Sequence, residues 1–164
     1  MEKKLTGKKL IALSSLCRKL KQGRKGKRVV FTNGCFDVLH AGHVRYLKKA
    51  KELGDILIVG LNNDSSVKKI KGRGRPVLPE AERAEILVAL EAVDYVVLFK
   101  EATPEGLIKK ILPDVLVKGA DWKAQDIVGA DVVKAAGGKV ARVRLVKGKS
   151  TTNIIEKIRK MKKP

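Results

Sequence analysis

The 164-residue sequence has few cysteines, few aromatic side chains and no long apolar run. Two cysteines, Cys17 and Cys35, do not make a disulfide framework, so we expect reduced thiols and a cytoplasmic protein. No stretch approaches the length of a transmembrane helix, and the charged start of the chain is not typical of a secretory signal peptide. Three Phe, two Tyr and one Trp provide few platforms for stacking nucleic-acid bases.

Acidic residues are also scarce relative to basic ones. The chain has 17 Asp and Glu against 37 Lys and Arg, and its formal net charge is +20. Such a charge fits a nucleic-acid or anionic-membrane partner, but it also fits a lysine-rich protein with a solvated surface. Because the basic residues are spread over both ends and most predicted helices, we favour the second interpretation and expect no membrane partner. A basic nucleic-acid-binding module remains the alternative from a different functional class.

Apolar periodicity predicts strands and helices in alternation. Continuous apolar runs typical of buried parallel strands cover residues 29–32, 55–61, 94–98, 114–118 and 139–145. Helical patterns cover residues 8–22, 41–53, a segment from Pro79, a segment with Thr103 as cap and Pro104 in the first turn, residues 127–136, and a last helix capped by residues 150–153.

This order predicts the fold class α/β. We expect a doubly wound, Rossmann-like, five-stranded parallel sheet with helices on both faces. Residues 1–164 form a single domain in this prediction, with an amino-terminal helix and basic loop over 1–26 and a frayed tail over 160–164. The amino-terminal helix could cover a sheet edge or form a homodimer interface.

The chain's only two histidines, His40 and His43, lie where the first strand gives way to a helix. Ligands bind at the carboxyl ends of parallel strands, and a helix amino terminus favours phosphate. Two imidazoles in this turn could bind the phosphates of a nucleotide and stabilise charge as a phosphorus–oxygen bond breaks. Gly42, between them, would let a phosphate approach the backbone closely.

Two side chains beside the histidines, Cys35 and Asp37, have several candidate roles. A metal site of His40, His43 and Cys35 is the alternative to phosphate binding, although no second ligand cluster completes it. Cys35 alone is better interpreted as a small filler than as a nucleophile. The Asp37 carboxylate could orient a histidine, help to hold Mg²⁺ or bind a sugar, and a helix-entry cap is its structural alternative.

Two further segments contain groups that could bind phosphate. The hydroxyls and backbone N–H groups of Ser150-Thr151-Thr152, at a helix start, could bind one, although an ordinary cap would look the same. A mobile basic loop predicted over residues 68–75 could close over a triphosphate and neutralise the leaving pyrophosphate, although a solvated run of charge is the commoner role.

These motifs carry a resemblance to a known family. Gly34-Cys35-Phe36-Asp37 with His40-Ala41-Gly42-His43 resembles the G-x-F-D-x-x-H-x-G-H signature of the cytidylyltransferase-like nucleotidyltransferases. Ser150-Thr151-Thr152 resembles the S-T-T of their second signature. Within that superfamily the chain is similar to the adenylyltransferase domain of bacterial ADP-heptose synthases over about residues 8–160, with matching stretches at 31–37, 90–94, 117–119 and 150–155.

The resemblance implies a reaction. It implies transfer of AMP from ATP, with Mg²⁺, to D-glycero-β-D-manno-heptose 1-phosphate, giving ADP-heptose and pyrophosphate for lipopolysaccharide core synthesis. Many similar proteins carry a sugar-kinase domain on the same chain, so the short sequence implies a separate sugar kinase.

Two departures from the family pattern matter. Residues 145–149 lack the Arg and Glu of the usual R-T-E-G-I-S-T-T signature, which favours the heptose branch over CTP-dependent glycerol-phosphate or choline-phosphate enzymes. Gly119-Ala120-Asp121-Trp122 stands where heptose enzymes usually read G-G-D-Y, so the aromatic plane is kept. A cytidylyltransferase of the glycerol 3-phosphate type and an FAD synthetase-like enzyme remain alternatives.

Motif and resemblance together predict the site residues. His40 and His43 would bind the β and γ phosphates, and Lys71 would reach over them. Arg83 matches a family arginine and, like Asp37, is assigned to substrate or metal without a fixed role. No residue is assigned as a dedicated metal ligand. The predicted nucleotide-binding residues are Thr32, Asn33, Gly34, Phe36, Gly42, Lys118, Gly119, Ser150, Thr151 and Thr152.

Overall fold

Five apolar segments form parallel strands in the computed structural model, which describes residues 7–144, 146 and 148–161. The strands are β1 (Val29–Gly34), β2 (Ile56–Asn62), β3 (Tyr95–Phe99), β4 (Val115–Gly119) and β5 (Lys139–Val143). Their order across the sheet is β3-β2-β1-β4-β5, and every neighbouring pair is parallel. The predicted Rossmann-like sheet is therefore confirmed.

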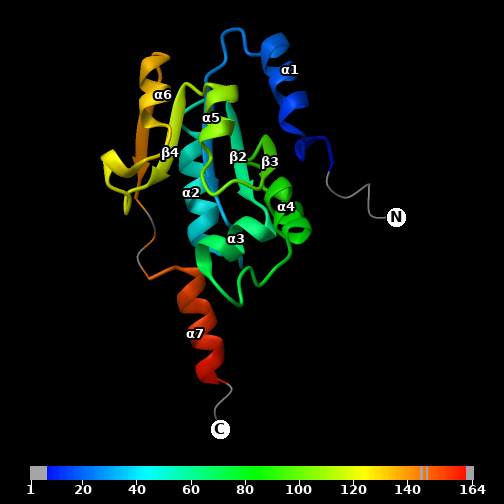
Figure 1. Cartoon of the computed structure of the whole chain (residues 1–164), viewed down its shortest axis with the longest axis vertical. Helices are drawn as coiled ribbons and strands as arrows, with labels where there is room; N and C mark the ends of the chain where they lie inside the picture. Colours follow the sequence, from blue (N-terminus) through cyan, green and yellow to red (C-terminus); the bar gives the residue numbers. More distant parts are fainter. Residues whose placement is uncertain (1–6, 145, 147, 162–164) are drawn as a thin grey trace.

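Helices cover both faces of this sheet (Figure 1). The helices among the described residues are α1 (Leu13–Gly23), α2 (Ala41–Lys51), α3 (Asp64–Lys71), α4 (Glu80–Ala89), α5 (Glu105–Ile111), α6 (Ala130–Ala135) and α7 (Thr151–Met161). Val30 of β1 packs with α2 and α4 on one face, whereas Val29 and Phe31 pack with α1, α5 and α6 on the other. This alternation follows from the two-residue period of a strand, and it buries the apolar residues of β1 completely.

The amino-terminal segment covers an edge of the sheet. The predicted helix start at residue 8 is wrong: Leu10 pairs with Val96 of the edge strand β3, the Ile11 N–H donates to the Val96 carbonyl at 3.0 Å, and the helix begins only at Leu13. An edge strand presents unpaired backbone groups, and pairing satisfies some of them. The α1 helix then packs Leu16 on the sheet face, and a role in a homodimer stays a prediction.

Other boundaries also differ from the prediction, and residues 68–71 of the predicted basic loop belong to α3. Thr103 is not a cap, because α5 begins at Glu105 with Pro104 as a cap residue that makes no side-chain hydrogen bond. The helix expected from residue 127 begins at Ala130, after Gly129 adopts a φ of +82°. The β5 strand ends at Val143, and the predicted last residue of that strand, Leu145, lies outside the described residues.

The last helix is longer than predicted. Residues 160 and 161 belong to α7 rather than to a frayed tail, because the apolar spacing that starts at Ile154 continues through Ile158 to Met161. Residues 162–164 lie outside the described part. The helix extends away from the sheet (Figure 1), and none of the described helices is long and apolar enough to cross a lipid bilayer.

Candidate active site at the carboxyl ends of the strands

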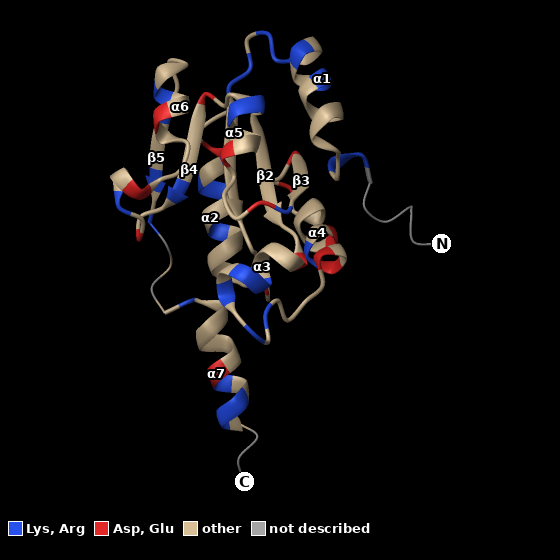
Figure 2. Ribbon diagram, viewed as in Figure 1, with Lys and Arg blue, Asp and Glu red and all other residues tan. Residues whose placement is uncertain are grey.

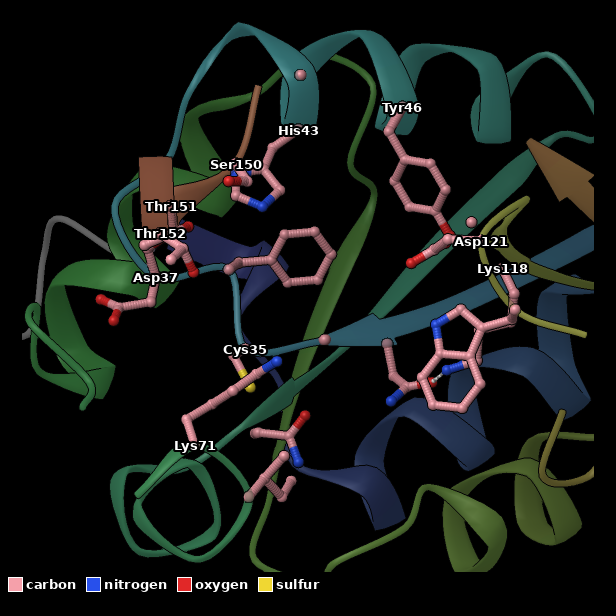
Figure 3. A pocket seen from close by; sticks show the side chains of 18 of the residues that line it. Cys35, Asp37, His43, Tyr46, Lys71, Lys118, Asp121, Ser150, Thr151 and Thr152 are labelled. Carbon is pink, nitrogen blue, oxygen red and sulfur yellow. Dashed lines mark hydrogen bonds between the residues drawn. The ribbon is translucent and has the colours of Figure 1, made fainter. Parts of the chain in front are cut away.

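A cleft of about 510 Å³ lies beyond the carboxyl ends of β1 and β4. These strands are neighbours from which the chain proceeds in opposite directions across the sheet, which is where an open α/β sheet binds ligands. The loop after β1, the loop after β4, the end of α3 and the start of α7 contribute side chains to the cleft (Figure 3). Its size suits a nucleotide or a molecule of similar size.

His40 and His43 shape the entrance of α2 into this cleft. His40 is the N-cap residue, and its Nδ1 accepts a hydrogen bond from the Gly42 N–H at 3.1 Å. The His43 Nδ1 accepts from the His40 N–H at 3.4 Å, and the two rings stack with centroids 4.0 Å apart. Because both Nδ1 atoms are acceptors, the neutral rings carry their protons on Nε2, which remains to donate to a ligand.

Both histidines are neutral in this setting at pH 7. Burial, with a smaller effect of the nearby His40, lowers the pKa of His43 to about 4. Burial also lowers the pKa of His40, and the charge of Lys149 adds to the effect. The sequence alone left the charge state open, and the structure favours hydrogen-bond donors over cations.

Gly42 makes room for its neighbours. A Cβ at this position would lie 2.8 Å from the His40 ring and 3.2 Å from the Cβ of Lys149. The His40 ring could not reach the Gly42 N–H past such a group. This contact is a second reason for glycine, and close phosphate approach stays a prediction.

Tyr46 fixes α2 to the sheet. Its hydroxyl lies 2.7 Å from the Thr32 Oγ1 and donates to the Val117 carbonyl at 3.3 Å, which joins α2 to β1 and β4. Burial raises the pKa of Tyr46 to about 12, so the hydroxyl stays protonated. Thr32 is fully buried, faces Tyr46 and is not among the residues that line the cleft, so its predicted part in nucleotide binding stays a prediction.

Asp37 anchors the segment after α3. Its buried carboxylate accepts from the Arg75 Nε at 2.7 Å, the Val77 N–H at 2.8 Å and the Leu78 N–H at 3.0 Å. Burial acts to raise the pKa of Asp37, but the two backbone donors and Arg75 outweigh it and the net pKa is lowered. These bonds attach the segment after α3 and do not cap a helix. The predicted roles of Asp37 toward a histidine, Mg²⁺ or a sugar stay predictions.

Arg83 is a structural residue. Its buried guanidinium donates to the carbonyls of Leu78, Cys35 and Asn62 and to the carboxylate of Asp64, at 2.6–3.0 Å. These partners occupy all three of its nitrogen atoms, and the side chain does not line the cleft. The structure therefore gives Arg83 a structural role, and its predicted binding of substrate or metal stays a prediction.

Lys118 lies deep in the cleft at the end of β4. Its ammonium donates to the Asn33 Oδ1 and lies 5.3 Å from the centre of the Trp122 ring. Burial lowers the pKa of Lys118 to about 8, and the charge of Asp121 acts in the opposite direction. Asn33, Lys118 and Trp122 thus form one polar and aromatic wall.

The start of α7 is tied to the histidine turn. The Thr151 Oγ1 donates to the Asp37 carbonyl at 2.5 Å, and the Ser150 Oγ accepts from the Asn153 N–H at 3.1 Å. The two hydroxyls therefore hold the helix start in place, as the capping alternative predicted for Ser150. Figure 3 shows Ser150, Thr151 and Thr152 beside His43.

Comparison with known proteins identifies the family. The sequence pattern of the family described as cytidylyltransferase-like matches residues 31–160. The chain belongs to the cytidylyltransferase-like family. The match spans the histidine turn and Ser150-Thr151-Thr152, the two segments that carried the resemblance, so that prediction is confirmed.

Several relatives are similar over most of this cytidylyltransferase-like chain. It is 58% identical over 136 residues to the bifunctional protein HldE of a Nitratiruptor species, and the matched region covers 83% of this chain and 29% of that protein. It is 57% identical over 152 residues to the bifunctional protein HldE of Geotalea uraniireducens, and the matched region covers 93% of this chain and 31% of that protein. The chain therefore spans less than a third of the length of these relatives.

Solved structures agree on the fold. A lipopolysaccharide core biosynthesis protein from Thermoplasma volcanium is 31% identical, with a TM-score of 0.61, over 76% of this chain and 100% of that one. The pantothenate synthetase of Thermus thermophilus has a TM-score of 0.64 at 16% identity over 93% of this chain and 70% of that one, which shows the fold alone.

The cytidylyltransferase-like fold brings most predicted residues into one cleft. Thr32 and Arg83 are the exceptions among the predicted residues. The predicted residues that line the cleft are Asn33, Gly34, Phe36, Asp37, His40, Gly42, His43, Lys71, Lys118, Gly119, Ser150, Thr151 and Thr152.

The cleft is also lined by residues that the sequence did not predict. Asn62 is the last residue of β2 and Thr103 lies in the loop after β3, so the rule that located the histidines could also have found them. The sequence contains no comparable signal for Ile70, Tyr46 and Lys149, which also line the cleft. The Cys35 thiol also lines the cleft, and burial raises its pKa, which keeps it protonated.

Proposed function

We propose that this chain transfers AMP from ATP to D-glycero-β-D-manno-heptose 1-phosphate and releases pyrophosphate. The observation that carries nucleotidyl transfer is the pair of neutral histidines at the start of α2, in a cleft that also contains the start of α7. The 57–58% identity to bifunctional HldE proteins supports the adenylyl donor and the heptose acceptor.

The chemistry needs no covalent enzyme intermediate. An oxygen of the sugar phosphate attacks the α-phosphorus of ATP, the bond between that phosphorus and the bridging oxygen breaks, and the electron pair leaves with pyrophosphate. The Nε2–H groups of His40 and His43 donate to the β and γ phosphates, where negative charge accumulates. The protein contributes positioning and hydrogen bonding.

Mg²⁺ enters this proposal with the nucleotide. Among the residues that the structure describes, no group of three or more His, Cys, Asp or Glu side chains is placed to hold a metal ion. Both Asp37 oxygens are occupied by protein donors. The donor set thus does not form a protein cage, and the phosphates themselves would hold the ion, which neutralises part of their charge when bound.

The product would serve lipopolysaccharide core synthesis. The relative from Thermoplasma volcanium is described as a lipopolysaccharide core biosynthesis protein, which supports this setting. A sugar kinase would supply the sugar 1-phosphate, and a kinase on a separate chain remains a prediction.

A coupled assay of pyrophosphate release tests the function. The purified chain is given ATP or CTP, with Mg²⁺, and a panel of acceptors that contains heptose 1-phosphate, other sugar 1-phosphates, glycerol 3-phosphate and FMN. We expect release with ATP and heptose 1-phosphate. Release with CTP and glycerol 3-phosphate, or with ATP and FMN, would replace the proposal with a cytidylyltransferase or an FAD synthetase-like enzyme.

A further inference from the structure

Four basic side chains line the cleft: Lys71, Arg75, Lys118 and Lys149. Two of them are engaged within the protein, because Arg75 pairs with Asp37 and Lys118 donates to Asn33. The hydrogen bonds and ion pairs between described residues leave the ammonium groups of Lys71 and Lys149 without a partner. These two lysines, together with Lys118, whose partner Asn33 is neutral, therefore supply the positive charge available to a ligand.

Lys149 lies against the histidine turn. Its Cβ is 3.2 Å from the position that a Cβ on Gly42 would occupy, so its stem lies beside the first turn of α2. It immediately precedes Ser150, whose hydroxyl caps α7, and its side chain is exposed at the rim of the cleft. Its charge also acts on His40, where it adds to the effect of burial in lowering that pKa.

The second lysine, Lys71, occupies a different part of the cleft. It is the last residue of α3 and lies near Cys35, whereas Ser150 lies beside His43 (Figure 3). The two cations therefore reach the cleft from different elements. Of the two, Lys149 is the one that adjoins both the histidines and the start of α7.

A leaving pyrophosphate needs full charges as well as hydrogen bonds. The histidines are neutral and supply only N–H dipoles, and an ammonium beside them would supply the charge. We propose that Lys149 binds the β and γ phosphates of the nucleotide next to His40 and stabilises pyrophosphate as it departs. This inference rests on the proposed nucleotidyl transfer and adds a catalytic residue that the sequence motifs did not include.

Binding measurements test the proposal without any turnover. Affinities for pyrophosphate and for AMP are measured by calorimetry on the wild-type chain and on Lys149→Met, Lys149→Arg and Lys157→Met. We expect Lys149→Met to weaken pyrophosphate binding by about tenfold to a hundredfold and to leave AMP binding unchanged. Lys149→Arg should retain most of the affinity.

Lys157→Met is the matched control. Lys157 lies on the exposed surface of α7, the helix that follows Lys149, and does not line the cleft, so its substitution removes the same charge at a distance. Equal losses in Lys149→Met and Lys157→Met would overturn the proposal, because net charge alone would then explain them. An equal loss of AMP affinity in Lys149→Met would also overturn it.

A second readout separates this inference from the proposed function. The chain has only two histidines, so the His40 ring can be followed by NMR. The pKa of His40 should rise in Lys149→Met and stay near the wild-type value in Lys157→Met and Lys149→Arg. If no donor and acceptor pair releases pyrophosphate, the proposed function fails. If Lys149→Met changes neither the pKa of His40 nor the affinity for pyrophosphate, only the proposed role of Lys149 is overturned.

Discussion

At the residue scale, the site depends on which nitrogen of each histidine the protein uses. Both Nδ1 atoms accept from backbone N–H groups at the start of α2, so the ring orientation and the tautomer are fixed together. Burial then keeps His43 neutral. The result is a pair of donors whose geometry exists before a ligand arrives, which reduces the reorganisation needed in the transition state.

Removal of one donor should slow the reaction. We expect His43→Ala to lower turnover at saturating substrate by about 10²–10³-fold, by analogy with the loss of an oxyanion-hole donor. His43→Gln, whose amide nitrogen can still donate, should retain more activity than His43→Ala. Steady-state pyrophosphate release measures both variants, and near-full turnover of His43→Ala would contradict the mechanism.

Neutral His43 also predicts how stability changes with pH. The pKa of His43 is about 4 in the folded protein and 6.5 in an unperturbed histidine. Between these values the unfolded chain binds a proton that the folded protein does not, so folding stability rises with pH in this window and is lost as pH falls. The loss from this group is at most about 3 kcal/mol.

Denaturant unfolding at several pH values measures this effect. The free energy of unfolding should fall more steeply from pH 6.5 to pH 4 in the wild-type chain than in His43→Gln. Because His40 is present in both proteins, its own titration largely cancels in the comparison. Parallel pH profiles would show that His43 titrates normally in the folded protein.

At the element scale, Asp37 and Thr151 connect three segments around the cleft. The Asp37 carboxylate holds the segment after α3, and the Asp37 carbonyl accepts from Thr151 at the start of α7. One residue of the loop after β1 therefore sets the position of a basic segment and of a helix start. These hydrogen bonds join parts of the chain that are up to 114 residues apart.

The carboxylate anchor should be essential for stability. Asp37→Asn removes the charge that pairs with the partly buried Arg75, and we expect a loss of about 3 kcal/mol in the free energy of unfolding. Trypsin should cleave faster after Arg73, between α3 and α4, because that segment loses its attachment. If Asp37 instead held Mg²⁺, stability would be unchanged and only the Mg²⁺ dependence of turnover would shift.

The hydroxyl of Thr151 should have a smaller effect. We expect Thr151→Val to cost about 1 kcal/mol of unfolding free energy, since it removes one side-chain hydrogen bond and keeps the shape. Thr152→Val is the matched control for stability, because the described hydrogen bonds give the exposed Thr152 side chain no partner. Urea unfolding of the two variants measures the difference, and equal stabilities would contradict the role of the Thr151 contact.

At the scale of the whole molecule, positive charge is distributed over most of the surface. Lys and Arg lie on α1, the loop before β1, α2, α3 and α7, whereas acidic residues gather on α4 (Figure 2). A net charge of +20 attracts anionic substrates over distances near the Debye length. Such a distribution supports general attraction of anions more than a single nucleic-acid groove.

Salt should therefore affect substrate capture more than chemistry. We expect KM for ATP to rise several-fold as potassium chloride increases from about 0.05 to about 0.3 M, with little change in kcat. Duplex DNA should bind no more tightly than the roughly 10⁻⁴–10⁻⁶ M typical of non-specific binding at physiological salt. Nanomolar binding to DNA at that salt would instead favour the nucleic-acid alternative.

The sequence by itself determined the strand and helix order, the parallel sheet and the histidine turn. Apolar runs and turn residues are local signals, and His40 and His43 lie close together along the chain, so their common location needed no tertiary information. The Ser150 cap was visible for the same reason. Helix starts such as Leu13 were less accurate, because pairing of Leu10 with a distant strand decided the boundary.

Only the tertiary structure decided what each polar side chain contacts. Asp37 and Arg83 resembled functional residues, yet most of their hydrogen-bond partners come from segments about 20 to 50 residues away in the chain. Burial of His43, which sets its charge state, likewise results from packing of the whole domain. A sequence shows which polar side chains are present. Long-range packing decides which of them are free to bind a ligand, because a buried polar group forms hydrogen bonds with the partners that the fold places next to it.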